Sequence, residues 1–328
     1  MSSKNRQLST AKKALALLCL TACTSALGQG FPQDNVNTAG PTPAGWLDAG
    51  NPLKQMNEPD CAVAPGKPNV VVCGMNDYSG VDPGSLDTPV NSPELRSVGD
   101  SWLGIAMSRD FGRRWIRGIH PCHPADPDCW NGQFYMADPN LSPFPGVLAM
   151  SGISGDRNGT QPGGLYMATW LESNAVTGPA YDFVEMVQLE QGTDGPGGGG
   201  SFLDKPGQDE SLAPPGTPPV VFTVPDPNIP GATKDVSVPA GSVHFVYSKF
   251  VGNDNNLGTK IIYNRYDNYD FSNAAFSTKL SEGSEINQGG YVSARDYGRD
   301  TLVVWRRFED NNEKASIMFV TCNLTKCT

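Results

Sequence analysis

The sequence predicts an all-β fold, and three observations support that prediction. Its 328 residues include 37 Gly and 28 Pro, which punctuate the whole chain. Between them recur short runs rich in Val, Ile, Tyr and Trp, the composition of strands bounded by turns. No long stretch keeps the 3.6-residue apolar period of an amphipathic helix. The runs also recur in a similar order, which indicates a repeat longer than a hairpin.

The repeat divides residues 55–328 into four units, and the first three are expected to hold four strands each. The strands of the first unit are expected at residues 60–64, 70–74, 102–107 and 115–116. Those of the second begin at residues 137–139 and continue at 146–150, 165–170 and 183–187. Those of the third begin at residues 202–206 and continue at 243–247, 261–263 and 276–280.

The fourth unit is shorter than the others. Its strands are expected at residues 286–290, 302–305 and 317–320, with no fourth strand before Thr328. Residues 192–242 are rich in Gly and Pro, and we interpret them as an insertion that forms a long surface excursion.

One octapeptide, residues 108–115, reads Ser-Arg-Asp-Phe-Gly-Arg-Arg-Trp and fits the spacing S-x-D-x-G-x-x-W, which begins at Ser108. Asp110 is expected to accept backbone N–H groups of its own turn, and Gly112 to supply the positive φ of a tight hairpin. Trp115 then leaves the turn as a large apolar side chain that packs between strands. Losing a buried Trp typically costs about 3–5 kcal/mol, so the octapeptide is first of all a folding device.

A degenerate copy of this pattern occupies residues 265–272. Asp267 keeps its place in the copy, Tyr269 stands at the glycine position, and the aromatic Phe271 comes one position early. Hairpins of one type are therefore expected at two places in the repeat.

The octapeptide resembles the Asp-box, or bacterial neuraminidase repeat, of sialidase-like β-propellers. Two short matches follow in family order, Phe-Leu-Asp-Lys-Pro at residues 202–206 and Asn-Gln-Gly at residues 287–289. The resemblance spans residues 55–327 and implies a propeller of four-stranded antiparallel blades. Such propellers usually have six blades, so three blades and most of a fourth predict an incomplete propeller, either truncated or closed in an unusual way. Unpaired strand edges would make it poorly soluble, or require closure by another copy or a missing segment.

Residues 1–28 have the composition of an export signal. A basic start without acidic residues precedes an apolar run at residues 14–22, which is too short to span a bilayer. Two processing sites compete: Ala-Leu-Gly at residues 26–28 suits secretion, whereas the lipobox-like Leu-Thr-Ala-Cys would place a lipid anchor on Cys23. Residues 29–54 are Gly-, Pro- and Asn-rich and are expected to form a flexible tether. We therefore expect a secreted, periplasmic or cell-surface protein without a transmembrane segment.

The charge of the chain narrows the choice of partner. The chain carries 24 Lys and Arg against 34 Asp and Glu, and without the four cations of residues 1–28 the balance is 20 against 34, or −14. A surface this acidic repels nucleic acid and anionic membranes. The partner is therefore expected to be an extracellular glycan or a protein, not a nucleic acid.

The cysteines outside the export signal form three near pairs, which an exported chain is expected to oxidise. The pairs are Cys61 with Cys73, Cys122 with Cys129, and Cys322 with Cys327. A hairpin centred on Lys67 places the first pair directly opposite each other, at a distance that suits a disulfide. His120 and His123 flank Cys122, but this spacing is not that of a standard zinc motif, so we predict no metal there.

Equivalent ends of the innermost strands of a propeller converge on one rim of its channel. We expect the rim to carry residues at equivalent or nearly equivalent positions of the four units, with two charged neighbours close by: Asp60, Asp138, Asp204 and Gln288, with Glu58 and Lys205. Their carboxylate oxygens could hold a ligand or a structural calcium ion, or supply an acid/base pair for glycoside hydrolysis. The competing interpretation is that each Asp caps a local turn beside its Pro.

The resemblance also implies a test for enzymatic activity. A sialidase-like site would have three arginines on a substrate carboxylate, a Tyr nucleophile with a nearby Glu, and an Asp acid/base, yet the early Arg-Ile-Pro motif is absent here. Arg109, Arg113 and Arg114 belong to the Asp-box hairpin, away from the usual active site, so no catalytic residue can be assigned. We therefore favour a glycan- or protein-binding module at the channel rim, with glycoside hydrolysis as the alternative.

Several residues that could suggest chemistry have a simpler interpretation. His244 sits inside an apolar strand, where a satisfied or surface-facing histidine is expected more often than a catalytic one. The recurring strand aromatics are expected to pack between blades and not to form a sugar-stacking platform; they are Trp102, Trp170, Tyr247 and Trp305.

Overall fold

The structure is a computed structural model. It describes residues 56–77, 102–120, 135–155, 163–174, 178–193, 200–226, 229–251, 258–282, 285–309 and 314–328. All of these belong to one compact unit of the chain. The predicted export signal at residues 1–28 with Cys23, the predicted tether at residues 29–54, and the predicted pair Cys122/Cys129 lie outside the described residues. Within the described part, no helix has the length and apolar character needed to cross a bilayer.

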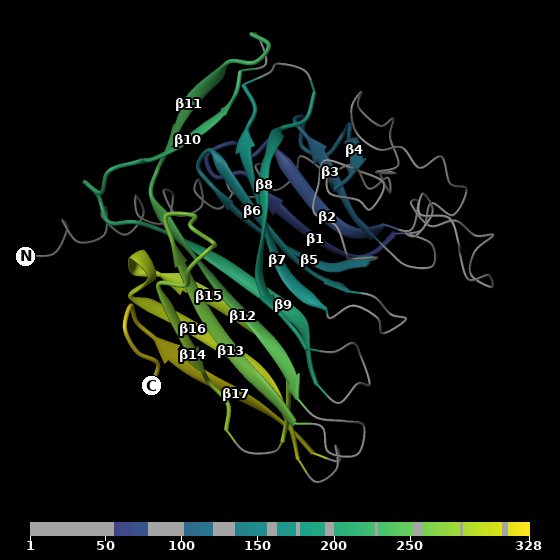
Figure 1. Cartoon of the computed structure of the whole chain (residues 1–328), viewed down its shortest axis with the longest axis vertical. Coiled ribbons are helices and arrows are strands. Elements are labelled where there is room, and N and C mark those ends of the chain that lie inside the picture. The colour runs from purple at the N-terminus through teal and green to yellow at the C-terminus, as the bar shows by residue number, and fades with distance from the viewer. Residues whose placement is uncertain are drawn as a thin grey trace, which may run out of the picture. The chain divides into compact units, whose positions relative to one another are not determined.

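The described residues confirm the all-β prediction and form four antiparallel blades (Figure 1). Blade one contains β1 (Met56–Val63), β2 (Val71–Asp77), β3 (Trp102–Ser108) and β4 (Ile116–Ile119). Blade two contains β5 (Tyr135–Phe144), β6 (Val147–Gly155), β7 (Gly164–Glu172) and β8 (Tyr181–Gln191). Blade three contains β9 (Ser201–Leu212), β12 (Gly241–Val251), β13 (Gly258–Asp267) and β14 (Phe276–Lys279). Blade four contains β15 (Ile286–Arg295), β16 (Asp300–Glu309) and β17 (Lys314–Cys322), with the short 3₁₀ turn η3 (Asp296–Gly298) between the first two.

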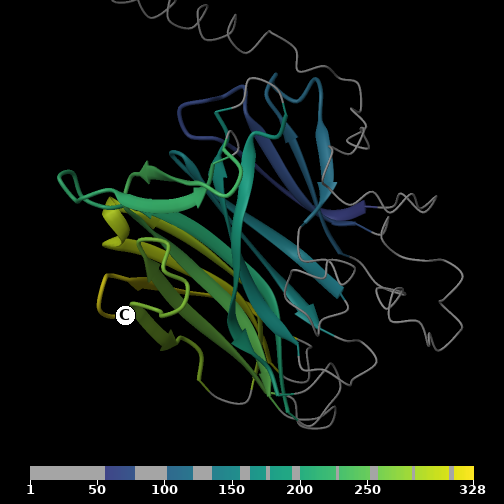
Figure 2. The ribbon, with the colours of Figure 1, turned by 45° about the horizontal axis from the view of Figure 1, so that its top comes forward.

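The blades stack in chain order, each face to face with the next (Figures 1 and 2). One apolar cluster joins blades one and two, a second joins blades two and three, and a third joins blades three and four. Strand β12 shows how this works, because Val243 and Phe245 face blade two whereas Val246 faces blade four. Successive residues of a strand point to opposite faces, so a sheet between two neighbours needs apolar residues on both. The expected aromatics Trp102, Trp170, Tyr247 and Trp305 accordingly lie buried in these layers.

Residues 192–242 are a surface excursion only in part, because residues 201–212 belong to blade three and the rest contains an exposed hairpin that the sequence did not predict. Strand β9 runs through Leu212, and β10 (Val220–Pro225) pairs with β11 (Thr233–Val238) as a separate two-stranded sheet. Phe222 and Val238 of this hairpin pack on the cluster between blades two and three. Pro and Gly in the turns hid the alternation that the two strands contain.

The octapeptide forms the turn between β3 and β4, as its residues predict. Asp110 Oδ1 accepts the Arg114 N–H at 2.8 Å, and Ser108 Oγ accepts the Gly112 N–H at 2.9 Å. Gly112 has a φ of 79°, and the half-buried Trp115 packs on a small cluster that includes Cys73. The degenerate copy forms the equivalent turn between β13 and β14.

Arg109 shows that this hairpin also ties two blades together. Its Nη2 donates to the carbonyl groups of Ser173 at 3.1 Å and Pro179 at 2.8 Å, beside the turn that joins β7 to β8. The arginine therefore has a structural role at the junction of blades one and two.

Both predicted disulfides that fall in the described residues are present. Cys61 and Cys73 are cross-strand partners of β1 and β2, which confirms the predicted hairpin register. Cys322, the last residue of β17, is bonded to Cys327, and Thr321 and Thr328 exchange two backbone hydrogen bonds. The chain therefore turns back on β17 and begins to pair with it.

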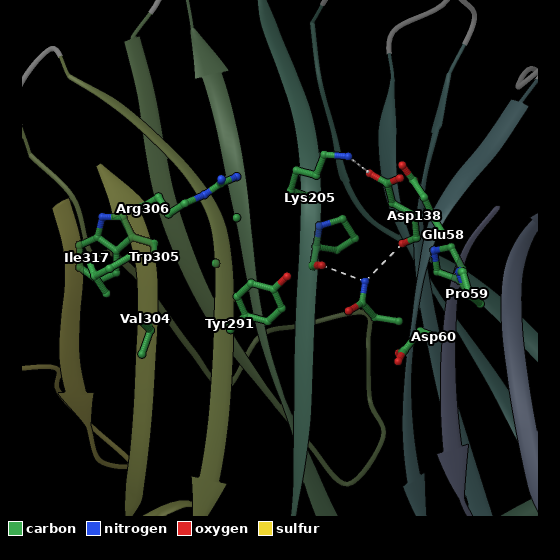
Figure 3. A pocket seen from close by; sticks show the side chains of 15 residues that line it. Glu58, Pro59, Asp60, Asp138, Lys205, Tyr291, Val304, Trp305, Arg306 and Ile317 are labelled. Carbon is green, nitrogen blue, oxygen red and sulfur yellow. Dashed lines mark hydrogen bonds and ion pairs between the residues drawn. The ribbon is translucent and has the colours of Figure 1, made fainter. Parts of the chain in front are cut away.

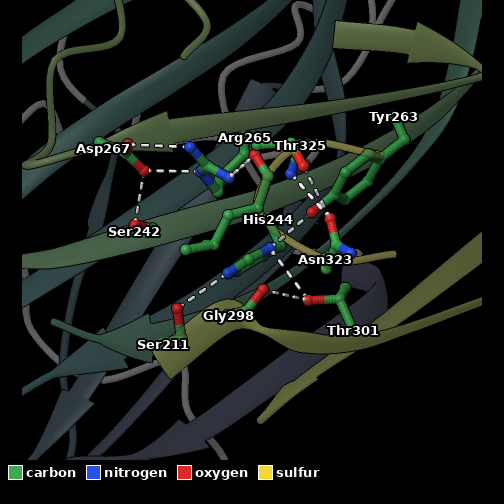
Figure 4. Close-up of polar contacts among 11 residues, drawn as sticks. Ser211, Ser242, His244, Tyr263, Arg265, Asp267, Gly298, Thr301, Asn323 and Thr325 are labelled. Atoms are coloured by element: carbon green, nitrogen blue, oxygen red, sulfur yellow. Dashed lines mark hydrogen bonds and ion pairs between the residues drawn. The ribbon is translucent and has the colours of Figure 1, made fainter. Parts of the chain in front are cut away.

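His244 is buried in the junction between blades three and four (Figure 4). Its Nε2 lies 2.8 Å from Ser211 Oγ, and its Nδ1 lies 2.7 Å from the Tyr263 hydroxyl. Burial, and then the nearby Arg265 guanidinium, lower the pKa of His244 from 6.5 to about 4, although Asp267 opposes the shift. His244 is thus a neutral, hydrogen-bonded structural residue, as the sequence indicated.

This histidine makes stability depend on pH. Between pH 6.5 and about 4 the unfolded chain binds a proton at His244 that the folded chain does not, so the free energy of unfolding falls as the pH falls through this range. A pKa shift of this size corresponds to a loss of roughly 3 kcal/mol in the free energy of unfolding, and most of this loss has occurred once the pH reaches the lower pKa. We expect His244→Gln to be less stable than the wild type at pH 8 but to lose less stability on acidification, as measured by urea unfolding at each pH. If the free energy of unfolding fell equally with pH in the two proteins, the assignment of this effect to His244 would be contradicted.

Candidate functional site

Each inner strand is interrupted at the same place by a β-bulge. The pairing register shifts after Asn57 in β1, after Ala137 in β5, after Asp204 in β9 and after Gln288 in β15. The first bulged residue has a positive φ in every blade, and these residues are Glu58 (50°), Asp138 (54°), Lys205 (50°) and Gly289 (63°). Positive φ is uncommon for residues other than glycine, and three of these four precede a proline. Backbone strain that recurs at bulges is typical of positions where side chains are aimed at a site.

The bulges bring three charged side chains together at the rim (Figure 3). Lys205 Nζ lies 3.0 Å from Asp138 Oδ2, and the Glu58 and Asp138 carboxyl groups each shift the pKa of the other. Asn76 braces the pair: its Nδ2 donates to Glu58 Oε2 at 3.0 Å, and its Oδ1 accepts the Asp138 N–H at 2.9 Å. Three blades therefore contribute to one polar cluster.

The cluster divides protons unevenly among its carboxyl groups. The hydrogen bond to Asp138, and then burial, raise the pKa of Glu58. Burial acts to raise the pKa of Asp138, but hydrogen bonds to Glu58 and Lys205 outweigh it, so this pKa is lowered. Burial raises the pKa of Asp204 to about 6 against the favourable field of Lys205. Asp138 is thus the carboxyl group of the cluster that loses its proton most readily, and Lys205 is its counter-ion.

A cleft of about 610 Å³ opens beside this cluster. One wall is formed by the bulges of β1, β5 and β9, and the other by blade four, which contributes Gly289, Tyr291, Trp305, Arg306 and Ile317. Figure 3 shows Arg306 on the opposite wall from Asp138, extended toward Lys205. The cleft therefore combines carboxyl, ammonium and guanidinium groups with an exposed aromatic ring.

The structure places the four predicted site residues near the rim but in different roles. Asp138 holds a bulge position and belongs to the cluster, and Asp204 directly precedes a bulge, where the charge of Asp138 contributes to its raised pKa. Asp60 lines the cleft, but its Oδ2 accepts the Leu141 N–H at 2.7 Å and so braces blade two. Gln288 directly precedes the fourth bulge and does not line the cleft.

Hydrogen bonds like that of Asp60, from a side chain to the backbone of the next inner strand, also connect the later blades. Asn140 Nδ2 donates to the Pro206 carbonyl at 2.8 Å, from blade two to blade three. Asp209 Oδ2 accepts the Ala294 N–H at 2.7 Å, between blades three and four. These polar bridges between neighbouring inner strands hold the bulges in place, so the Asp60 carboxylate is accounted for by structure.

Sequence reasoning placed Glu58 and Lys205 near the site but missed Asn76, Tyr291 and Arg306. A signal for the first two is a charged residue directly before a proline, which recurs in three of the four inner strands. No comparable signal marked Asn76, Tyr291 or Arg306, because they reach the cleft only through the pairing of strands and the packing of blades.

The cluster does not have the arrangement of a metal site. Within the described residues, no group of three or more His, Cys, Asp or Glu side chains is placed to hold a metal ion. The Lys205 ammonium already supplies a positive charge among the carboxyl groups. The structural calcium ion considered from the sequence is tested by thermal melting with added calcium and then with chelator. Because Lys205 takes the cation's place, we expect no change in melting temperature; a clear rise with calcium would contradict this.

No protein-family model matches the sequence, and no curated protein matches it either. Solved structures similar to this chain include an α-L-arabinanase of Penicillium chrysogenum complexed with arabinobiose, at 13% identity and a TM-score of 0.42, covering 85% of this chain and 64% of that one. An α-L-arabinanase of Cellvibrio cellulosa complexed with arabinohexaose has 13% identity and a TM-score of 0.36, covering 81% and 73%. A Trypanosoma rangeli sialidase mutant displaying trans-sialidase activity has 11% identity and a TM-score of 0.29, covering 81% and 54%. The chain thus spans less than two thirds of the Penicillium and Trypanosoma proteins, and likenesses this weak carry no inference about activity.

Replacing Lys205 tests the charge balance of the cluster. Lys205→Met leaves the Asp138 carboxylate, whose side chain is only 11% exposed, without its counter-ion. We expect a loss of about 1–3 kcal/mol at neutral pH by urea unfolding. Because the pKa of Asp138 lies below its ordinary 3.8, the stability that Lys205 supplies is present above that pH and is lost as the pH falls through the lowered pKa.

The matched control is Lys234→Met. Lys234 is exposed on β11 and makes no ion pair that involves a described residue. The control should change stability by less than about 0.5 kcal/mol. A Lys205→Met variant as stable as the control would show that the ion pair contributes nothing.

Proposed function

We propose that the rim cleft binds a glycan and that the chain acts as an exported glycan-binding module. The observation that carries this proposal is the convergence of Glu58, Asp138 and Lys205 on three strained bulges beside an open cleft. Ligand sites are typically concave and combine apolar walls with a few fixed polar groups. Carboxylate and ammonium groups suit the hydroxyl groups of a sugar, which both donate and accept hydrogen bonds.

Tyr291 adds an apolar element to this cleft. Its side chain is 74% exposed on the wall opposite the carboxyl cluster. An aromatic ring offers a large rigid surface on which the apolar face of a sugar ring can stack. A cleft with charged groups on one wall and an exposed ring on the other therefore suits a carbohydrate.

The compartment is part of the proposal. Disulfides form and persist in oxidising environments, and both Cys61–Cys73 and Cys322–Cys327 are bonded. They agree with export to the cell surface, the periplasm or the medium. Whether the exported chain is lipidated on Cys23 stays a prediction that mass spectrometry of the purified protein would test.

Glycoside hydrolysis is the second candidate, favoured by the opposite pKa shifts of Glu58 and Asp138. When the pKa values of two paired carboxyl groups are shifted apart, one group can act as the acid and the other as the base. The geometry weakens this candidate, because glycosidases hold their two carboxyl groups about 5–9.5 Å apart so that the reacting sugar fits between them. Glu58 and Asp138 instead lie so close that each directly shifts the pKa of the other. Binding is therefore the better-supported function.

The test is a glycan array, followed by calorimetric titration of any glycan that binds and an assay for released reducing ends. We expect binding without turnover. Asp138→Asn should weaken binding by about tenfold or more, because losing a hydrogen bond to a charged group costs about 1.5–3 kcal/mol. The matched control, Asp182→Asn, makes the same chemical change at an exposed position of β8 and should bind as the wild type does.

The outcomes separate the candidates. Turnover that Glu58→Gln abolishes would establish hydrolysis in place of binding alone. No binding to any glycan by the folded protein would contradict the proposal, and binding unaffected by Asp138→Asn would exclude the rim as the site. Circular dichroism of each variant excludes unfolding as the cause.

A further inference from the structure

Blade four has an apolar face that nothing described covers. Among the described residues, the three most exposed large apolar side chains all lie on it: Tyr291 at 74%, Phe319 at 71% and Ile317 at 67%. Leu302, on the same face, is 40% exposed. The opposite face of the sheet, with Val303 and Trp305, is buried against blade three.

These side chains form one continuous strip. Tyr291 is the cross-strand partner of Val304, and Val304 is the partner of Phe319. Ile317 lies two residues before Phe319, and Leu302 lies two residues before Val304, so all share one face. Cross-strand neighbours lie about 5 Å apart, so the strip extends over all three strands. We call it the outer face of blade four.

The corresponding faces of the earlier blades are buried. Every residue of β6 in blade two is buried, which means that blade two is covered on both sides. Antiparallel sheets with one solvated face alternate apolar and polar residues, whereas apolar residues on both faces indicate packing on both sides. The outer face of blade four has the composition of a surface that packs on another sheet.

The charges on this face are self-complementary. Asp300 begins β16 and Arg306 lies six residues further along it, both exposed, with Leu302 and Val304 between them on the same face. If two copies stack with their β16 strands antiparallel, Arg306 lies over the partner's Asp300, and symmetry repeats the contact. A two-fold interface needs a patch of this kind, which pairs with itself. Arg295, the cross-strand neighbour of Asp300, offsets part of its charge.

We propose that a second copy of this chain packs on the outer face of blade four and forms a two-fold dimer. The apolar strip supplies the core of the interface, and the Asp300–Arg306 contacts set its antiparallel register. The chain as a whole carries a net charge of −10, so two copies repel each other at long range. On this face the opposite charges of Asp300 and Arg306 attract across the interface, which favours association of two copies here.

The dimer would also change the cleft. Tyr291, Val304, Arg306 and Ile317 line the cleft as well as the outer face. A second copy seated there would therefore form a wall on the open side of the cleft. Dimerisation itself does not depend on the proposed glycan binding and is measured without ligand.

The experiment is analytical ultracentrifugation of the full chain over a concentration series. We expect the wild type to be a dimer and Ile317→Asp to raise the dissociation constant by about tenfold or more, as central interface residues do. The matched control is Ile229→Asp, since Ile229 is also an exposed isoleucine, at 56%, but lies between β10 and β11. The control should dimerise as the wild type does.

A charge exchange tests the register. Asp300→Arg and Arg306→Asp should each weaken the dimer, and the double variant should restore it, because the two contacts are then reversed together. A wild type that stays monomeric throughout the series would overturn the proposal, as would equal dimerisation of Ile317→Asp and Ile229→Asp. A double variant weaker than both single variants would overturn the antiparallel register.

Discussion

Face-to-face packing of apolar sheets is the constraint on which the rest of this structure depends. A sheet between two others must be apolar on both faces, so its strands lose the simple alternation of a half-exposed sheet. The buried strands β6 and β7 show this most completely. The stack aligns the inner strands, and only that alignment allows Glu58, Asp138 and Lys205 to meet although they are far apart in the sequence. The polar rim is thus a product of the apolar layers behind it.

The rim shows how local backbone strain and tertiary packing act together. A residue held at positive φ before a proline costs free energy, and it persists only where its surroundings fix it. Here the bridges from Asp60, Asn140 and Asp209 connect each inner strand to its neighbour. These hydrogen bonds hold the four bulges in register, and the side chains of the bulged residues Glu58, Asp138 and Lys205 face the cleft.

Much of the fold could be predicted from the sequence because its signals are local. The turn after Ser108 is specified by its own residues, and the register of Cys61 with Cys73 follows from counting outward from a five-residue turn. The site was less predictable, because a bulge shifts the strand register and changes which side chains face inward. Counting residues from one Asp to the next therefore did not show that Asp60 braces blade two from the wall of the cleft, or that Gln288 lies outside the cleft. Tyr291 and Arg306 depend on contacts between strands, which no local pattern records.

The hairpin of β10 and β11 has a consequence for how the protein comes apart. Phe222 lies 6.0 Å from the Tyr269 ring, and Val238 is almost fully buried, so the hairpin seals the seam between blades two and three. Regions with the densest apolar burial open last, and those with less open first. Blades two and three would then persist as a cohesive pair while the terminal blades loosen, and amide hydrogens in this central pair would be the slowest to exchange with solvent.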